Sequence, residues 1–354
     1  PWTSEIISQL EKVFELDLDH PGANHLFIHA VEASKNPEQG LEHADRLRTL
    51  IPGAGHLVHM PAHIYIRIGQ YHDGTLANRM AIKSDEAYLT QCNQQGLYPL
   101  GYYPHNYHFL WATATLEGRS ELAIDAAVKT ASKPPDSLLS FCGYQTLQHY
   151  KAIPYYAYVR FGKWDTILKE VSPKDEHPYL RGVWHYARGM AYTAKNRLDK
   201  AKDELQILDK LKNNNDVNDL KIWELNSAGN LLKIASEVLQ GEISAKEKHY
   251  DKAVRHLQAA VELETHLLYD EPPTWFYPVR HNLGAVLMEA GRYSEAEIVF
   301  REDLKEFPKN GWALFGLMQS LKKQNKENEV IQIEKEFERS WQYADITLRS
   351  SRII

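Results

Sequence analysis

HNLGAVLMEAGRYSEAEIVFREDLKEFP, residues 281–308, predicts two helices joined by a tight turn. Its apolar residues recur at the spacing of one helical face, and the same period resumes after Gly291. Glycine adopts the left-handed conformation that ends a helix without a steric penalty. Each helix has only one apolar face, so we expect this pair to bury that face against a neighbouring pair.

Related turns recur along the chain. A turn residue, a spacer, an aromatic or apolar residue and then a small residue occur at 69–74, 118–123, 196–201, 248–253 and 291–296. Their spacing scatters around roughly 40 residues, a period typical of an α-solenoid, in which helix pairs stack on one another. No segment alternates convincingly like a strand. The sequence therefore predicts an all-α fold.

The sequence here resembles the tetratricopeptide repeat family. In residues 281–308, the positions that fit the pattern of that family are Leu283, Gly284, Gly291, Tyr293, Ala296, Phe300 and Pro308. Other copies depart from it, since Ile167 takes a small-residue position and Asn196 replaces the turn glycine. The resemblance implies one right-handed superhelix over residues 1–354, with histidine-rich repeats in 1–165 and C-terminal repeats in 166–354. It also implies that the first helix of each pair lines a concave groove.

Seven histidines of the N-terminal third recur at three offsets before a turn. The set before Gly69 is His63, His59 and His56, at six, ten and thirteen residues; before Gly118 it is His108 and His105, at ten and thirteen; before Lys35, at the equivalent turn, it is His29 and His25, at six and ten. Because first helices of neighbouring repeats lie side by side in the tetratricopeptide superhelix, the resemblance implies that all three sets face one basin.

Imidazole is the commonest protein ligand for transition metals. An ion bound at about 2.0 to 2.1 Å can bridge two helical residues that lie three or four positions apart. Clustered imidazoles repel one another when protonated, so packing alone explains three sets in register poorly. We expect one or two ions bound by His25, His29, His56, His59, His63, His105 and His108. A plain polar groove that binds a peptide is the alternative.

The expected ligand shell is rich in imidazole, lacks cysteine and has one nearby carboxylate, Glu32. Such a shell favours copper, with zinc or iron as alternatives, over calcium or magnesium. Two clusters of three histidines on helices resemble the coupled copper sites of tyrosinase-like proteins in ligand type. Glu32 is the candidate catalytic acid or base, and it is alternatively a ligand or an outer partner of an imidazole N–H.

These features favour a metalloenzyme, an oxidoreductase rather than a hydrolase, that acts on a small molecule or peptide in the groove. Two other functions remain open: a non-catalytic scaffold for protein or peptide partners, and a protein for metal storage or delivery.

The N-terminal third is also similar to bacterial repeat proteins that carry HPGxxHxxIH followed by AGHxxHMPxHIxxRxG. Residues 20–29 and 54–69 match these patterns, and YPHNYHFLW at 103–111 belongs to the same resemblance. Pro61 interrupts the second motif, so we expect a kink or a late helix start that leaves His56 and His59 on an irregular segment. Such relatives are often exported, and the chain begins at Pro1 rather than methionine. We therefore expect a preceding segment and keep a periplasmic location open.

EPPTWFYPVRHNLGAVL, residues 271–287, marks a second candidate region at the start of an inner helix. If the superhelix curls, this region approaches the histidine basin. Arg280 would then bind an anionic substrate group, and Tyr277 and His281 would shape the pocket. His149, thirteen residues before Gly162, extends the same groove. Plain packing is the alternative for the aromatic residues.

Composition excludes several classes of function. The formal net charge of −6 provides no basic surface for nucleic acid. No apolar run reaches the length of a membrane span, and no phosphate-binding glycine loop or nucleophile motif occurs. Cys92 and Cys142 are too isolated to form a disulfide framework or a thiolate metal site.

Overall fold

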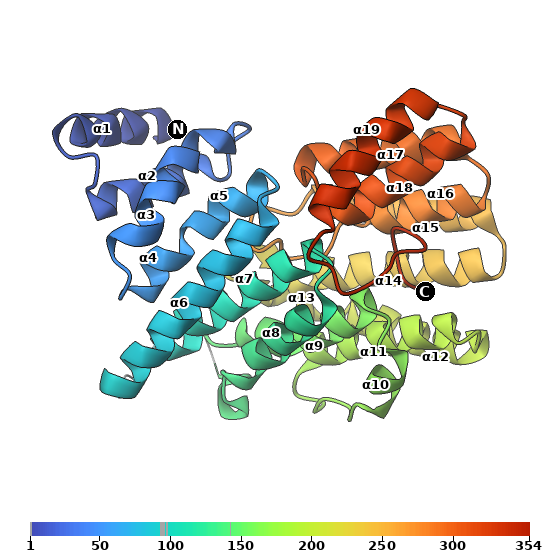
Figure 1. Ribbon diagram of the computed structural model, residues 1–354. Helices are drawn as coiled ribbons and strands as arrows, with labels where there is room; N and C mark the ends of the chain where they lie inside the picture. Colours follow the sequence, from blue (N-terminus) through green and yellow to red (C-terminus); the bar gives the residue numbers. More distant parts are fainter. Residues whose placement is uncertain (1, 93–95, 97, 142) are drawn as a thin grey trace.

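The computed structural model describes residues 2–92, 96, 98–141 and 143–354. Figure 1 shows consecutive helices packed as antiparallel pairs that stack into a curved array. After α1 (Thr3–Leu16), the pairs are α2 (Pro21–Val31) with α3 (Leu41–Leu50), α4 (Gly55–His59) and α5 (Pro61–Arg67) with α6 (Tyr71–Cys92), α7 (Tyr103–Leu116) with α8 (Ser120–Ser132), α9 (Leu147–Arg160) with α10 (Trp164–Lys169), α11 (Pro178–Ala194) with α12 (Leu198–Leu211), α14 (Ala228–Lys246) with α15 (Tyr250–Thr265), α16 (Arg280–Glu289) with α17 (Tyr293–Glu306), and α18 (Gly311–Lys323) with α19 (Glu327–Ser340). This is the all-α solenoid that the sequence predicts.

Short elements lie between these helices. They are the 3₁₀ turns Pro37–Gly40 and Asp136–Leu138, the π-helical turn Tyr98–Tyr102, the helix α13 (Asn215–Asp219), and the antiparallel strands β1 (Lys221–Ile222) and β2 (Asn226–Ser227). No helix in the described part of the chain combines the length and apolarity needed to cross a bilayer. Cys92 is exposed, and Cys142 lies outside the described residues.

The turn between the helices of a pair uses a left-handed residue, as the sequence motif predicts. Positive φ angles occur at Gly69 (76°), Gly118 (74°), Gly162 (64°), Asn196 (56°), Lys248 (64°), Gly291 (75°) and Asn325 (57°). Lys35 is not among these residues, because α2 ends at Val31 and a 3₁₀ turn follows. The expected equivalence of Lys35 to the turn glycines is therefore wrong in backbone geometry.

Pro61 divides the second inner helix into α4 and α5. It occupies the first turn of α5, where its missing N–H leaves no helical acceptor unpaired. His56 and His59 lie on α4, which is short but helical, so the expected irregular segment is wrong. Met60, between α4 and α5, keeps helical dihedral angles of φ −48° and ψ −38°, and both short helices contribute histidines to the same region.

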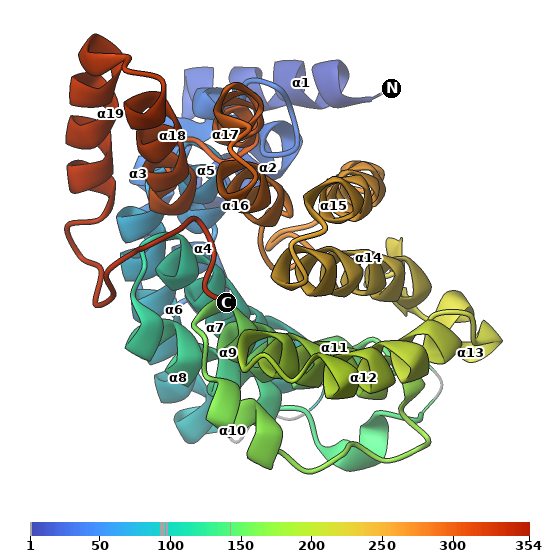
Figure 2. The same ribbon diagram turned by 90° about the vertical axis from the view of Figure 1, so that its right-hand side faces the viewer.

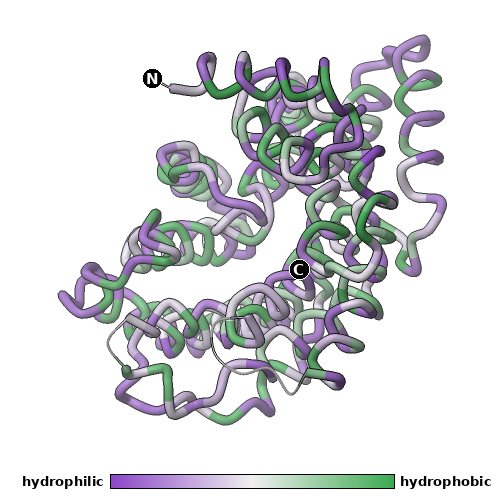
Figure 3. The backbone as a smooth tube through the Cα atoms, turned by 90° about the vertical axis from the view of Figure 1, so that its left-hand side faces the viewer, coloured by the Kyte–Doolittle hydropathy of each residue, from purple (hydrophilic) through white to green (hydrophobic). Residues whose placement is uncertain are grey.

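Figure 3 shows hydrophilic and hydrophobic residues alternating along the helices. In α12, for example, Ala201 and Leu208 are completely buried, whereas most of the charged positions between them face outward. This one-sided apolar pattern is what requires each pair to stack on the next.

The superhelix curls until its C-terminal pairs reach the N-terminal ones (Figure 2). The Tyr71 hydroxyl donates to the carbonyl of Pro308 at 2.8 Å, and the Trp312 indole N–H donates to the carbonyl of Thr115 at 2.9 Å. The carboxylate of Asp345 accepts the backbone N–H groups of Ser120 and Glu121, at 2.7 and 3.0 Å, at the start of α8. We call this contact between α17–α19 and α5–α8 the seam.

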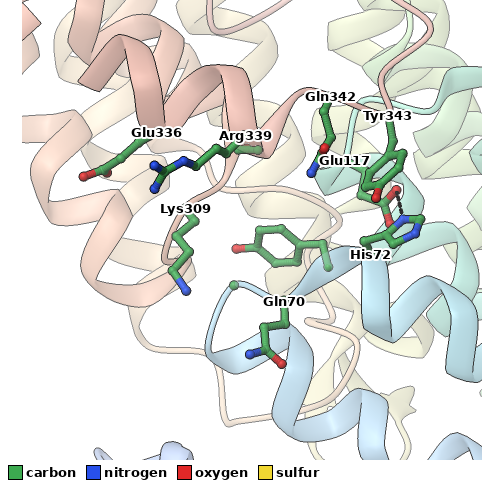
Figure 4. A pocket seen from close by; sticks show the side chains of 11 residues that line it. Gln70, His72, Glu117, Lys309, Glu336, Arg339, Gln342 and Tyr343 are labelled. Carbon is green, nitrogen blue, oxygen red and sulfur yellow. Dashed lines mark hydrogen bonds and ion pairs between the residues drawn. The ribbon is translucent and has the colours of Figure 1, made fainter. Parts of the chain in front are cut away.

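A cavity of about 460 Å³ lies in the seam (Figure 4). Its walls include Gln70, His72 and Glu117 from the N-terminal pairs and Lys309, Glu336, Arg339, Gln342 and Tyr343 from the C-terminal ones. The His72 ring stacks on Tyr343 with a centroid separation of 3.7 Å, and its Nδ1 lies 3.4 Å from Glu117. The two ends of the solenoid are thus held together by polar contacts as well as by buried aromatic residues.

The seam gives a test of the fold through two turn glycines. Gly118 and Gly291 have nearly the same φ, but a Cβ on Gly118 would overlap the Trp341 ring, whereas a Cβ on Gly291 would meet no atom within 4 Å. Alanine at either position costs about 1 kcal/mol in backbone strain. We expect Gly118→Ala to lose roughly a further 1–3 kcal/mol of unfolding free energy through overpacking, measured by denaturant titration. Equal losses in the two variants would mean that the contact with Trp341 is not a tight one.

Candidate metal centre

Six of the seven candidate histidines form two groups of three. The outer triad is His25, His29 and His56, and the inner triad is His59, His63 and His105. In each triad the nearest ligand nitrogens all lie within 4.8 Å of one another. The rings come from α2 and α4 for the outer triad and from α4, α5 and α7 for the inner triad. Neighbouring hairpins therefore deliver the imidazoles, as the recurrent offsets predict.

Within each triad, one pair of Nε2 atoms is already close to the separation found around a metal ion. His25 Nε2 lies 3.2 Å from His56 Nε2, and His59 Nε2 lies 3.0 Å from His63 Nε2. Two ligands bound tetrahedrally at about 2.05 Å would be about 3.4 Å apart. The third nitrogen of each triad lies within 4.8 Å of this pair, so the residues fit a bound ion.

A neighbouring amide fixes the tautomer of His59. The Asn78 side-chain N–H₂ donates to the carbonyl of Gly74 at 2.7 Å, which turns Oδ1 of Asn78 toward His59. His59 Nδ1 lies 2.8 Å from this oxygen and donates to it. The lone pair of Nε2 is then free and directed toward His63, which is the arrangement that supports a metal-bound histidine.

Glu32 lies between the two triads. One carboxylate oxygen accepts from His29 Nδ1 at 2.8 Å, and the other lies 2.5 Å from His63 Nδ1. Burial of Glu32 favours its neutral form, but the charges and hydrogen bonds of His63 and His29 outweigh burial and lower its pKa to about 2. A carboxylate that holds Nδ1 leaves Nε2 of each ring available as a ligand.

The two triads differ in exposure and adjoin each other. The His29 side chain is 40% exposed, whereas His59 is completely buried. The ring centroids of His29 and His63 are 5.6 Å apart, and those of His56 and His59 are 6.2 Å apart. Phe109 packs on all three rings of the inner triad, with centroids 4.7 to 5.5 Å away. The outer triad is thus more exposed to solvent than the inner triad.

Four of the six imidazoles favour their neutral form. Burial, together with the charges of neighbouring histidines, lowers the pKa of His25 and of His56 to about 4 and that of His105 to about 3. The same causes lower the pKa of His59 well below its usual value. Neutral imidazole is the form that binds metal, so these rings need lose no proton at neutral pH.

His108 does not join the two triads, which corrects the expectation of seven converging rings. Its ring stacks on Trp111, with centroids 5.3 Å apart, and contacts His149 at 5.6 Å. His149 is buried as well, and its Nδ1 lies 2.8 Å from the Tyr179 hydroxyl. His108 and His149 are therefore packed in the interior of the repeats, and His149 is not free to contact a substrate.

Two other expected substrate contacts are also core residues. Both nitrogens of the buried His281 are engaged, Nε2 with Asp303 at 2.9 Å and Nδ1 with the Arg160 guanidinium at 2.9 Å. Tyr277 is buried beneath that guanidinium, 4.3 Å from the ring centroid. The expectation that Tyr277 and His281 line a substrate pocket is therefore wrong, because the helix offset that places them inward also buries them.

Arg280 differs from these neighbours because it borders a cavity of about 630 Å³. Arg67, one helical turn after His63 on α5, and the loop residues Tyr269, Asp270 and Glu271 border the same cavity. The curl of the superhelix thus brings the 271–287 region toward the N-terminal repeats, as expected for a curled superhelix. The histidine offsets gave no sign of Asn78 or of these loop residues.

No family model matches the sequence, and no curated protein matches it. Among solved structures, the chain is similar to the tetratricopeptide domain of P58(IPK), with 11% identity, a TM-score of 0.28 and coverage of 96% of this chain and 89% of that chain. It is also similar to yeast Tom70, with 15% identity, a TM-score of 0.30 and coverage of 96% and 88%. Both TM-scores are low, so the fold rests on the hairpins described above and the function on the residues of the site.

Proposed function

We propose that the protein binds two transition-metal ions at neighbouring histidine triads and uses them in oxidation–reduction of a small molecule or peptide. One ion would be held by His25, His29 and His56, and the other by His59, His63 and His105. The observation that carries this proposal is the pair of triads joined by a shared carboxylate, Glu32, which contacts one ring of each.

The ligand set favours copper, with zinc or iron as alternatives, because all six nitrogens belong to imidazoles and no thiolate is near among the described residues. Two adjacent copper ions would supply the ability to exchange two electrons with a bound molecule. The protein would contribute open access at the outer triad and exclusion of water by Phe109 at the inner triad.

Of the three roles considered for Glu32, the geometry favours that of a positioning residue. Its oxygens contact Nδ1 atoms, on the side of each ring away from the Nε2 atoms that meet at the triads. A carboxyl with a pKa near 2 is also a weak base at neutral pH. Glu32 would therefore orient His29 and His63 and compensate the charge of the bound ions.

A scaffold for protein or peptide partners is the second candidate function. Helix α11 presents two buried rings with an unpartnered nitrogen, Trp184 Nε1 and His185 Nε2, which a peptide backbone would satisfy. A storage or delivery protein would bind the same ions without catalytic turnover.

Metal stoichiometry tests the two sites separately. We expect untagged protein loaded with copper and then dialysed to retain about two equivalents, measured by elemental analysis. His29→Ala should lose about one equivalent from the outer triad, and His63→Ala should lose the one at the inner triad. His108→Phe keeps the stacking on Trp111 and should still hold two. A loss in His108→Phe as large as that in His63→Ala would contradict the assignment.

The pH dependence of retention follows from the lowered pKa values. Protons displace a metal only when they can protonate its ligands. The pKa values of about 4 for His25 and His56 and about 3 for His105 move this competition well below the unperturbed value of about 6.5. We expect copper to be retained at pH 5.5 and released toward pH 4, measured after dialysis. Release centred near pH 6.5 would indicate binding to exposed, separate histidines.

Turnover distinguishes an enzyme from a carrier. With ascorbate as the reductant, we expect the protein loaded with two copper equivalents to consume dioxygen faster than the same concentration of copper in buffer, measured with an oxygen electrode. Glu32→Gln removes the negative charge and should weaken metal binding by about 10- to 100-fold and slow the reaction. Dioxygen consumption no faster than that of free copper would favour storage or a scaffold.

A further inference from the structure

The cavity bordered by Arg280 is separate from the triads but close to them in the fold. It lies between the ends of α2 and α5, the end of α15 and the 266–279 loop, and its volume is about 630 Å³. This volume is within the range of about 300–1,000 Å³ that is usual for small-molecule sites. Ala33, the residue after Glu32, borders the cavity, and Arg67 follows His63 by one helical turn.

Several polar groups in its wall are buried and have no protein partner. Trp275 is 2% exposed and Glu271 is 9% exposed, yet Trp275 Nε1 and Glu271 Oε2 make no hydrogen bond within the described part of the chain. Arg67 Nε is also buried and makes no hydrogen bond within the described part of the chain. Burying such a group without a hydrogen bond is unfavourable, and a polar ligand would recover that loss.

Acidic and basic side chains border the cavity without forming a direct ion pair. Among the described residues, Arg67 and Arg280 form no ion pair within 4.0 Å with any carboxylate, although Glu264, Asp270 and Glu271 border the same space. The acidic side chains are held by neutral donors instead. The N–H of Val279 donates to Glu264 at 3.1 Å, and the Thr274 hydroxyl donates to Asp270 at 3.0 Å.

Arg67 is likewise held in place by neutral groups. The Arg67 guanidinium donates to the carbonyl of Ser34 at 3.4 Å and lies 5.5 Å from the centroid of the Tyr269 ring. Acidic and basic groups that are held apart in one cavity suit a ligand that carries both charges, and this preorganisation lowers the entropic cost of binding.

We propose that this cavity binds a small zwitterion of the amino-acid class, a free amino acid or a dipeptide. Its carboxylate would lie between Arg67 and Arg280, and its ammonium would donate to Glu271 and Asp270. Apolar wall residues such as Ile66 and Phe307 would contact the ligand side chain. In the proposed function, this ligand would be the substrate of the metal centre. That role as substrate rests on the proposed function, whereas binding of the ligand in the cavity does not.

Burial also leaves the acidic side chains short of positive charge. It raises the pKa of Glu264 to about 8 and that of Asp270 to about 6, and it raises the pKa of Glu271 well above its usual value. A ligand ammonium supplies the missing charge. A ligand ammonium would favour the ionised form of these carboxyl groups, whereas an anionic ligand would favour the protonated form.

Calorimetric titration with the dipeptide leucyl-alanine tests the proposal. We expect saturable binding to the full chain, and we expect N-acetylation or C-amidation of the dipeptide to weaken it at least tenfold. The titration is run on metal-free and on copper-loaded protein. Binding to the metal-free protein tests the cavity independently of the metal centre, and copper stoichiometry tests the metal centre independently of the cavity.

Two variants assign the ends of the ligand. Arg280→Gln should remove the preference for a free carboxylate, and Glu271→Gln should remove the preference for a free ammonium. Arg292→Gln, which alters an exposed arginine paired with Glu295, is the matched control and should bind as the unaltered protein does. Thermal unfolding of each variant checks that it is folded.

The proposal is overturned if neither leucyl-alanine nor free leucine binds, or if the blocked dipeptides bind as tightly as the free one. It is also overturned if Arg280→Gln and Glu271→Gln are folded and keep the selectivity of the unaltered protein. The proposal is supported if Arg280→Gln loses only the preference for a free carboxylate and Glu271→Gln loses only the preference for a free ammonium.

Discussion

A hydrogen bond between an imidazole and an oxygen acceptor joins the two helices of several hairpins, and the rest of the site depends on it. The bonded residues are 19 positions apart in each case: Asn24 and His43, His59 and Asn78, His185 and Glu204, and Glu237 and His256. In a repeat structure, equivalent positions face equivalent partners, so one bond recurs with changed residue types. Because this bond engages only Nδ1, it leaves the second nitrogen of each ring available.

The second nitrogen is used differently in each hairpin. The His43 ring packs against Phe14 and Phe27, with centroids 4.4 and 4.1 Å away, which is a packing role. His59 instead turns Nε2 toward His63, and its ring contacts that of His105. The proposed metal centre thus uses the same hydrogen bond between two helices that elsewhere only packs a hairpin. This explains why a histidine at a repeated offset is by itself an ambiguous signal.

The sequence predicted the fold and most of the triads because both follow from local periodicity. The left-handed turn residues and the helix starts at Pro21 and Pro61 are encoded within single hairpins. The recurrent offsets brought six histidines together but also included His108, because an offset specifies the height of a residue along a helix better than the direction of its side chain. The loop from Tyr269 to Glu271 could not be placed, because its position depends on the accumulated curvature of all the repeats.

The curvature of the superhelix also affects how rigidly the histidines of the triads are held. An open solenoid is stabilised only by contacts between neighbouring repeats, so its terminal hairpins unfold most readily. The triads lie in the first hairpins, where such fraying would separate the ligands. The seam prevents this by adding contacts from the opposite end: the Tyr71 hydroxyl, at the start of the helix that follows α5, bonds to a carbonyl 237 residues away. Closure of the superhelix therefore gives His63 and Glu32 a rigid support that the first hairpins alone would lack.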